Sequence, residues 1–355
     1  MQARLGEIVR LTGTTEHSAF TDLCQWHGRY YCAWREARTH NILPRGNLHI
    51  HVSSDGHDWR LTFNYEEFIH PFADLRDPKF LVSDDVLYLL CGAYLPHPAY
   101  RPLVDGVMPA SADNLIQTHL TYTTDGETWS DLIPILRPQY WGWSGVQVGR
   151  CWYLASYHTG NHAVAEAQSL VLWSGTKLLG PLVSQPIYLG ASGEKAGGTY
   201  RYPDTYPSEP VLWYDAASGF LGCAVRTEQT LHLGYGRAPY GLEDWRWHAT
   251  RSTVHPSAIL QTSQGWLLAG REVIPGTLLR TGRRGPGTAA TCLYALEGHT
   301  LRKLLTLPSA RDCGYAGLCA GPEEGTVLIS WYSQHEVPDG LPGAAVYVAT
   351  VEIEE

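Results

Sequence analysis

Short apolar runs alternate with turns along the whole chain. The runs are rich in β-branched and aromatic residues, and Gly, Asp or Pro follows most of them. Examples are GRYYCAW, NLHIHVS, VLYLLCGAY, THLTYTT, CWYLASY, SLVLWS, FLGCAV, GWLLAG, TVLISWY and AAVYVATVEI. This pattern is typical of strands joined by tight turns, and long helical periodicity is scarce. The sequence therefore predicts an all-β protein.

A longer phrase recurs six times, with a spacing of roughly 50–60 residues. Each copy reads as a strand, a turn and a second strand that ends in small residues. The copies are FTDLCQWHGRYYCAWRE, DPKFLVSDDVLYLLCGA, GVQVGRCWYLASYHTG, EPVLWYDAASGFLGCAVR, HPSAILQTSQGWLLAGRE and YAGLCAGPEEGTVLISWYS. They predict a six-bladed β-propeller of four-stranded antiparallel blades, because ring closure removes the exposed sheet edges. The first strand of each copy is expected to line a central pit. No linker divides the chain, so we expect residues 1–355 to form a single domain.

The composition fits this architecture and restricts the classes of binding partner that we expect. Hydrophobic residues make up 44% of the 355 residues, and charged residues make up 17%. The formal net charge of −9 offers no basic face to phosphate, so we expect no nucleic-acid partner. No apolar run approaches transmembrane length, so we expect no membrane partner. The start, MQARLGEIVRL, lacks the apolar core of a signal peptide. The chain as given is therefore expected to be cytoplasmic, although a removed secretion signal would leave the same sequence. The oligomeric state stays open.

Cysteine, histidine and aromatic residues bear on ligands. The eight cysteines form no CxxC pair, and several lie inside apolar runs such as YLLCGAY. The sixteen histidines show no metal-ligand spacing, so we expect neither a metal site nor a cofactor. Thirteen Trp and 21 Tyr, against six Phe, favour rings that carry a polar group. Such rings either stack on sugars or cover pleated sheets, and the first use predicts a carbohydrate partner.

Two segments share one turn motif. HIHVSSDGHDWR at 49–60 and HLTYTTDGETWS at 119–130 each contain S/T-x-D-G-x-x-W after a strand. Asp55 and Asp125 are expected to bond the backbone of their own turns, and Gly56 and Gly126 supply permissive backbone. The motif resembles the Asp-box of the sialidase superfamily. In that family it fixes blade hairpins away from the catalytic centre.

The resemblance to the sialidase (neuraminidase) superfamily extends over nearly the whole chain. It is closest to a bacterial branch of BNR-repeat glycoside hydrolases. The matching phrases are HSAFTDL, WREARTH, DLRDPKF, SEPVLW with AVRTE, HPSAI with AGRE, and GYAGL with WYSQHE. The resemblance implies hydrolysis of O-glycosyl bonds at a central site.

The resemblance also implies roles for individual residues. Tyr315 in DCGYAGL matches the nucleophilic tyrosine of the family, and Glu209 in YPSEPVLW matches its carboxylate partner. A tyrosine needs such a base because its ordinary pKa lies near 10. Arg226 in CAVRTE and Arg271 in LAGRE match two of three arginines that bind a substrate carboxylate, for which a planar guanidinium is suited.

The sequence departs from the family where the first arginine should stand. The expected R-I-P phrase is replaced by residues 19–22, Ala-Phe-Thr-Asp. Asp22 would repel a substrate carboxylate, which favours a sugar other than sialic acid. Arg35 or Arg76 would have to replace the missing cation. The acid/base catalyst is either Glu36, in WREAR, or Asp22. Asp77 adds another carboxylate to the expected site.

Several further residues are candidate sugar contacts. Trp141 and Trp143 alternate in QYWGWSG, and one of them is expected to stack on a sugar ring. Histidines that follow or begin inner strands are expected to contact hydroxyl groups: His40, His158, His255 and His335. The loop 95–114 is expected to cover the pit. The loop 274–288, with Arg280, Arg283 and Arg284, is expected to attract an acidic substrate.

Three functions are compatible with these residues. The first is an exo-acting glycoside hydrolase that removes a terminal sugar, with Tyr315 and Glu209 as the nucleophilic pair. The second is a polysaccharide lyase that acts on a uronic acid through Tyr315 and His335 or His255. The third is a glycan-binding propeller without catalysis. Fold alone does not separate them, because propellers host many functions.

Overall fold

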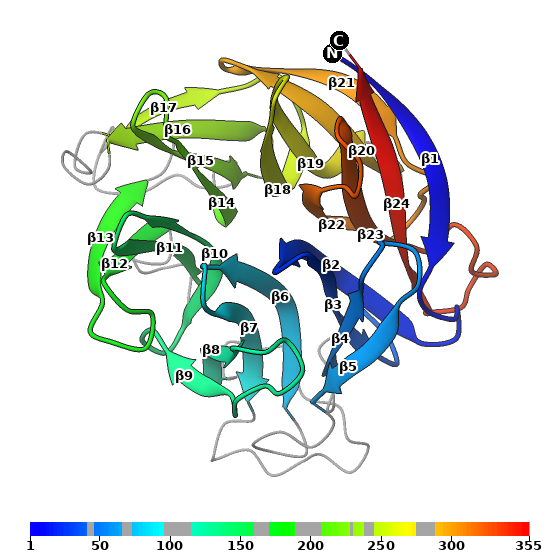
Figure 1. Ribbon diagram of the computed structural model, residues 1–355, viewed down its shortest axis with the longest axis horizontal. Helices are drawn as coiled ribbons and strands as arrows, with labels where there is room; N and C mark the ends of the chain where they lie inside the picture. The colour runs from blue at the N-terminus through cyan, green and yellow to red at the C-terminus, as the bar shows by residue number, and fades with distance from the viewer. Residues whose placement is uncertain are drawn as a thin grey trace, which may run out of the picture.

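Six four-stranded antiparallel sheets form a ring in the computed structural model, as the repeats predict (Figure 1). The structure describes residues 1–40, 46–65, 73–95, 115–159, 170–188, 207–227, 230–237, 245–274 and 288–354. All regular secondary structure in these ranges is β-strand. Accordingly, no helix in the described part of the chain is long and apolar enough to cross a membrane.

Each blade takes its strands in chain order from the centre outward, except the last. Blade one contains β2 (His17–Trp26), β3 (Arg29–Ala37), β4 (Asn47–Ser53) and β5 (Arg60–Asn64). Blade two contains β6 (Asp74–Val82), β7 (Leu87–Leu95), β8 (Leu115–Thr123) and β9 (Ile133–Ile135). Blade three contains β10 (Tyr140–Val148), β11 (Cys151–His158), β12 (Leu170–Gly175) and β13 (Val183–Tyr188).

The remaining blades follow the same order. Blade four contains β14 (Ser208–Asp215), β15 (Phe220–Arg226), β16 (Leu231–Arg237) and β17 (Arg246–Ala249). Blade five contains β18 (Val254–Thr262), β19 (Gly265–Ile274), β20 (Thr288–Glu297) and β21 (Thr300–Thr306). Blade six contains β22 (Cys313–Ala320), β23 (Thr326–Ser333), β24 (Ala345–Glu354) and β1 (Gln2–Arg10).

The two ends of the chain close the ring together. β1 pairs antiparallel with β24 from Gln2 opposite Glu354 to Arg10 opposite Tyr347, so the first strand is the outer strand of the last blade (Figure 1). β2, β6, β10, β14, β18 and β22 surround the centre, and these are the strands that begin the six repeats. Closure by both ends ties blade six to blade one and leaves no gap in the ring.

The apolar runs are continuous because the middle strands are buried on both faces. In β3 the residues 30–35 are all buried, and in β23 the same holds for 327–333. Each blade packs against two neighbours, so side chains on both faces of a strand enter a core. Trp34, Trp141 and Trp331 are among the largest side chains removed from solvent.

The two repeated turns adopt the expected local structure. Asp55 Oδ1 accepts hydrogen bonds from Ser53 Oγ at 2.9 Å, from the amide of His57 at 2.8 Å and from the amide of Asp58 at 2.9 Å. Gly56 has a φ of 81°, and a Cβ there would lie 2.7 Å from Leu328 Cδ1. This position therefore requires glycine for both its backbone and its close approach to blade six.

Candidate functional site

The inner strand of every blade carries a bulge near its beginning. The ladder shifts between Ala19 and Asp22, Arg76 and Lys79, Gly142 and Ser144, Ser208 and Val211, Pro256 and Ala258, and Gly314 and Gly317. Four residues at these bulges have positive φ: Phe20 at 61°, Asp77 at 52°, Glu209 at 53° and Tyr315 at 44°. Such backbone is unfavourable for bulky residues, and a bulge redirects a side chain. Asp77, Glu209 and Tyr315 thus interrupt the strand pairing at matching positions of blades two, four and six.

Tyr315, Glu209 and Arg226 form one hydrogen-bonded chain. The Tyr315 hydroxyl donates to Glu209 Oε1 at 2.7 Å, and Arg226 Nη1 donates to the same oxygen at 2.5 Å. The Glu209 side chain is 8% exposed, so this carboxylate is held by its partners rather than by water. Burial raises the pKa of Tyr315 well above its usual range, and the charges of Glu209 and Asp77 add to this effect. Tyr315 therefore stays protonated until Glu209 accepts its proton.

Asp77 lies in the same site. Burial raises its pKa to about 6; the charge of Glu209 also raises it, while Arg76 and Lys79 lower it. Asp77 and Glu209 occupy matching bulges of their inner strands, both with positive φ. Because its pKa is raised, Asp77 is partly protonated near neutral pH, as an acid catalyst must be.

Arg271 and His255 meet beside Tyr315. Arg271 Nη2 lies 3.0 Å from His255 Nδ1, and its guanidinium carbon lies 5.8 Å from the centre of the Tyr315 ring. Burial lowers the pKa of His255 to about 2, and Arg226 and Arg271 add to this effect. His255 is therefore neutral. Among the described residues, Arg271 has no carboxylate partner within 4.0 Å. Its charge is available to an anionic group.

The two arginines that were expected to replace the missing cation differ in their surroundings. Arg35 is fully buried and binds Asp74 through Nε at 2.7 Å and Nη2 at 3.1 Å. Arg76 Nε lies 3.4 Å from Asp74 Oδ2, its Nη2 donates to the His40 carbonyl, and its guanidinium carbon lies 4.9 Å from the centre of the Phe20 ring. Phe20 occupies the bulge of blade one, so Arg76 brings a cation to the place where the sequence lacks one.

The two acids expected to serve as acid/base catalyst lie outside the Tyr315–Glu209 chain. Asp22 Oδ2 accepts the amide of Phe80 at 2.7 Å, and Asp22 Oδ1 lies 3.7 Å from Lys79 Nζ. Glu36 accepts a hydrogen bond from Ser18 Oγ at 3.0 Å and lies 3.6 Å from His49. Asp22 thus joins blade one to blade two, and Glu36 lies among side chains of β2 and β4.

This architecture is shared with solved structures of sialidases. The phage phi92 endosialidase superposes with a TM-score of 0.59 at 12% identity, covering 99% of this chain and 69% of that one. The Trypanosoma rangeli sialidase superposes with a TM-score of 0.55 at 9% identity over 94% of this chain, which spans 55% of that protein's length. The chain has the sialidase-like propeller fold. The same trypanosomal sialidase in complex with sialic acid gives 0.53 at 9% identity, covering 99% of this chain and 57% of that one. The sequence itself matches no protein-family model and no curated protein.

Three predicted sugar contacts of this sialidase-like propeller pack against other aromatic rings. Trp143 is fully buried, with its ring centre 5.6 Å from that of Tyr315, so it supports the tyrosine and offers no open face for stacking. His158 contacts the ring edge of Tyr140, and His335 packs on Tyr347 of β24. The loop residues 96–114 and 275–287, which include Arg280, Arg283 and Arg284, lie outside the described residues.

A cluster that sequence spacing did not reveal lies next to the pit. His17 Nε2 and His40 Nδ1 lie 2.8 and 2.6 Å from Asp312 Oδ2, and the Tyr332 hydroxyl donates to Asp312 Oδ1 at 2.7 Å. Tyr332 also stacks on Tyr315, with ring centres 6.1 Å apart. The members come from three distant segments, so no local motif marks them. The only sequence signal was the position of His40 after an inner-blade phrase.

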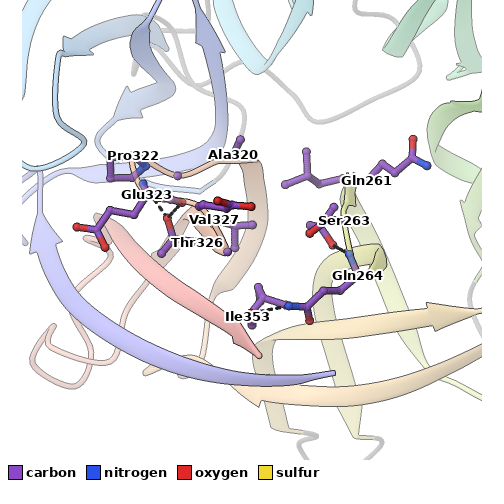
Figure 2. A pocket seen from close by; sticks show the side chains of 14 residues that line it. Gln261, Ser263, Gln264, Ala320, Pro322, Glu323, Thr326, Val327 and Ile353 are labelled. Carbon is purple, nitrogen blue, oxygen red and sulfur yellow. Dashed lines mark hydrogen bonds between the residues drawn. The ribbon is translucent and has the colours of Figure 1, made fainter. Parts of the chain in front are cut away.

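A separate pocket lies at the far ends of β18 and β22 from the bulges. It has a volume of about 360 Å³ and lies between the turns 261–264 and 321–325 (Figure 2). Gln264 donates to the Ile353 carbonyl at 2.9 Å, and Thr326 donates to the Glu323 carbonyl at 2.6 Å. None of the predicted site residues lines this pocket, so it is distinct from the candidate catalytic site.

Proposed function

We propose that this protein is an exo-acting glycoside hydrolase that removes a terminal sugar from a glycan or glycoside. The observation that carries the proposal is the 2.7 Å hydrogen bond from the Tyr315 hydroxyl to Glu209 Oε1, with Arg226 on the same oxygen. A partly buried phenol joined to a buried carboxylate is the arrangement that a tyrosine nucleophile needs. Tyrosine nucleophiles are a known exception to the use of two carboxylates in glycoside hydrolysis.

The proposed reaction has two displacements. Tyr315 Oη attacks the anomeric carbon while its proton passes to Glu209, and the glycosidic oxygen leaves with a proton from an acid. Water then attacks the same carbon and gives a proton to that acid's conjugate base, and the tyrosine oxygen leaves and recovers its proton from Glu209. The two inversions return the original anomeric configuration. All protons are accounted for within the site, so no metal or cofactor is required by this sequence of steps.

We assign the acid/base role to Asp77. Glu36 and Asp22 were the candidates from sequence, but Asp22 is committed to Lys79 and the Phe80 amide, and Glu36 to Ser18. Asp77 has a pKa raised to about 6 by burial and lies near Glu209. Two acidic groups whose environments separate their pKa values are a common basis for dividing acid and base roles.

The charges favour a sugar that carries an acidic group. Arg271 has a guanidinium with no carboxylate partner among the described residues, and it lies beside the ring of Tyr315. Arg76, over Phe20, adds a second cation on the side of blade one. A positive group does not assist an oxocarbenium-like transition state, so these arginines are better used on a substituent of the sugar.

The lyase alternative has less support. His255 accepts the hydrogen bond from Arg271 at Nδ1, so the neutral ring carries its proton on Nε2 and offers no lone pair for abstracting a substrate proton. His335 packs on Tyr347 of β24, away from Tyr315. Formation of an unsaturated, ultraviolet-absorbing product from a uronic-acid glycan would support the lyase hypothesis over the hydrolase proposal.

A panel of chromogenic glycosides tests the proposal. It should contain an α-sialoside, a uronic-acid glycoside and neutral glycosides. Release of a free sugar with retained configuration, abolished in Tyr315→Phe, is expected from an acidic member of the panel. Hydrolysis that persists in Tyr315→Phe would remove the nucleophile assignment, and sugar binding without turnover would leave a glycan-binding propeller.

A further inference from the structure

Two imidazoles converge on one carboxylate oxygen near the pit. His17 begins β2, His40 follows β3 and Asp312 precedes β22, so blades one and six each contribute to the cluster. His17 Nε2 and His40 Nδ1 lie 2.8 and 2.6 Å from Asp312 Oδ2. One ligand atom from each of the three residues lies within 4.8 Å of the other two. The atoms are therefore close enough to surround a single small ion.

The donor set suits a divalent transition metal. Neutral imidazole nitrogen and carboxylate oxygen are ligands that Zn²⁺ and its neighbours accept, at about 2.0–2.2 Å. Atoms at that distance from a common ion lie about 3 Å apart in octahedral geometry and about 3.4 Å apart in tetrahedral geometry, so the separations of 2.8 and 2.6 Å between the two imidazoles and Asp312 would have to widen around an ion. Three protein ligands leave positions for water or substrate.

The residues around the cluster bear on whether it can hold a metal ion. His17 is fully buried, and its Nδ1 has no hydrogen-bond partner among the described residues. Because a carboxylate only accepts hydrogen bonds, Asp312 holds the proton of His17 on Nε2 in this structure, and binding of an ion requires this proton to leave or to move to Nδ1. The Tyr332 hydroxyl binds the other oxygen of Asp312 at 2.7 Å. Such outer contacts orient ligating carboxylates and are part of most metal sites.

We propose that His17, His40 and Asp312 bind one divalent transition-metal ion of the zinc type. The site is reached from the side of His40, whose side chain is 49% exposed. A hollow of about 380 Å³ lies beside it along the chain, lined by Thr15, Glu16, Arg38, Thr39 and Pro342.

The bound ion would lie next to the proposed catalytic tyrosine. The Phe20 ring contacts both His40 and Tyr315, with ring centres 5.2 Å apart in each case. Tyr332 connects the two places as well, because it binds Asp312 and stacks on Tyr315.

Metal binding is tested directly, without reference to glycosidase activity. Tag-free full-length protein is stripped with a chelator, dialysed and titrated with Zn²⁺ by calorimetry and with Co²⁺ by visible absorption. We expect one ion per chain, with an absorption spectrum of nitrogen and oxygen ligands and no thiolate charge-transfer band. The thiolate band is a useful marker because Cys151 is the one cysteine that is not buried.

The key variants are His40→Ala and Asp312→Asn. His40 is half exposed, so its loss should leave the fold intact, and far-ultraviolet circular dichroism with a thermal melt checks this. Both variants are expected to weaken Zn²⁺ binding by at least about 100-fold, whereas Tyr332→Phe should weaken it about 10-fold. His299→Ala is the matched control, because His299 and His248 form a stacked pair with ring centres 3.7 Å apart that lies elsewhere.

The outcomes are distinct. Stoichiometric binding that His40→Ala and Asp312→Asn remove and His299→Ala retains supports the site. Failure to bind Zn²⁺ or Co²⁺, or equal binding by the His40→Ala protein, overturns it. The cluster would then be a hydrogen-bonded support for Tyr332. Neither result depends on whether a glycoside is cleaved, so the hydrolase proposal and the metal proposal fail separately.

Discussion

Tyr315 and Glu209 are 106 residues apart in the sequence, yet the hydroxyl of one donates a 2.7 Å hydrogen bond to the carboxylate of the other. They belong to blades six and four, with blade five between them in the ring. Each leaves its strand at a bulge with a positive φ. The same backbone feature in β6 presents Asp77, so one structural device repeated in alternate blades assembles the proposed catalytic set.

Tyr315→Phe is expected to abolish hydrolysis while the propeller stays folded. The change removes only the nucleophilic oxygen, and kcat should fall by at least about 10³-fold. Activity on the cleaved glycoside and a thermal melt are the measurements. Tyr31→Phe is the control, because the Tyr31 hydroxyl is buried without a hydrogen-bond partner among the described residues. Equal losses in both proteins would point to a general structural effect.

Activity should fall as pH rises through about 6. The acid form of Asp77 is needed, and burial raises its pKa to about 6, so deprotonation above that value removes the proton donor. Asp77→Asn should eliminate this limb and lower kcat by about 10²–10⁴-fold, with a smaller loss for activated leaving groups. Asp85→Asn, on the exposed turn of the same blade, should leave the profile unchanged. A persistent limb in Asp77→Asn would assign the titration to another group.

In Glu209→Gln, the fall in activity with rising pH should occur at a lower pH than in the unmodified protein. The charge of Glu209 is one of the causes that raise the pKa of Asp77, so its removal lets the pKa of Asp77 fall. The residual activity of this variant, measured over pH, tests the coupling. An unchanged limb would mean that the two carboxyl groups do not interact. The variant should also lose about 10²–10⁴-fold in kcat, because Tyr315 loses its base.

Arg35 is expected to act on stability rather than on substrate binding. Arg35 and Asp74 are both fully buried and paired, and Arg76 Nε lies 3.4 Å from Asp74 Oδ2. Arg35→Met leaves Asp74 with Arg76 as a remaining cation, and it should cost about 3 kcal/mol of the free energy of unfolding. Replacing both residues by apolar ones in Arg35→Met/Asp74→Leu should recover much of that loss. Denaturant unfolding measures both. A raised KM with unchanged stability would show that Arg35 contributes to substrate binding instead.

The turn at Asp55 should contribute stability only above acidic pH. Hydrogen bonds from the amides of Asp58 and His57 lower the pKa of Asp55 to about 2. A lowered pKa in the folded state stabilises the protein above the unfolded pKa near 4, and this stability is lost as pH falls toward 2. Asp55→Ala should therefore lower the melting temperature at pH 7 and make little difference at pH 2. Asp58→Ala, whose carboxylate is 90% exposed, is the control.

The repeats in the sequence predict the architecture. Apolar runs, turn residues and six copies of one phrase predicted six four-stranded blades, and β2, β6, β10, β14, β18 and β22 confirm the inner strands. These features are local: a strand needs a buried run, and a hairpin needs Asp and Gly at its turn. Family resemblance also selected Tyr315, Glu209, Arg226 and Arg271, whose side chains lie around one pit.

Only the tertiary structure decided how the remaining polar residues are used. Arg35, Asp22 and Glu36 follow the same strand patterns as Tyr315 and Glu209, but the side chains they meet come from other strands and blades. The meeting of His17 and His40 of blade one with Asp312 of blade six likewise depends on ring closure between distant segments. Sequence thus determined the strands and their order through short-range patterns. The partners of each charge were set by packing between blades, which no local pattern records.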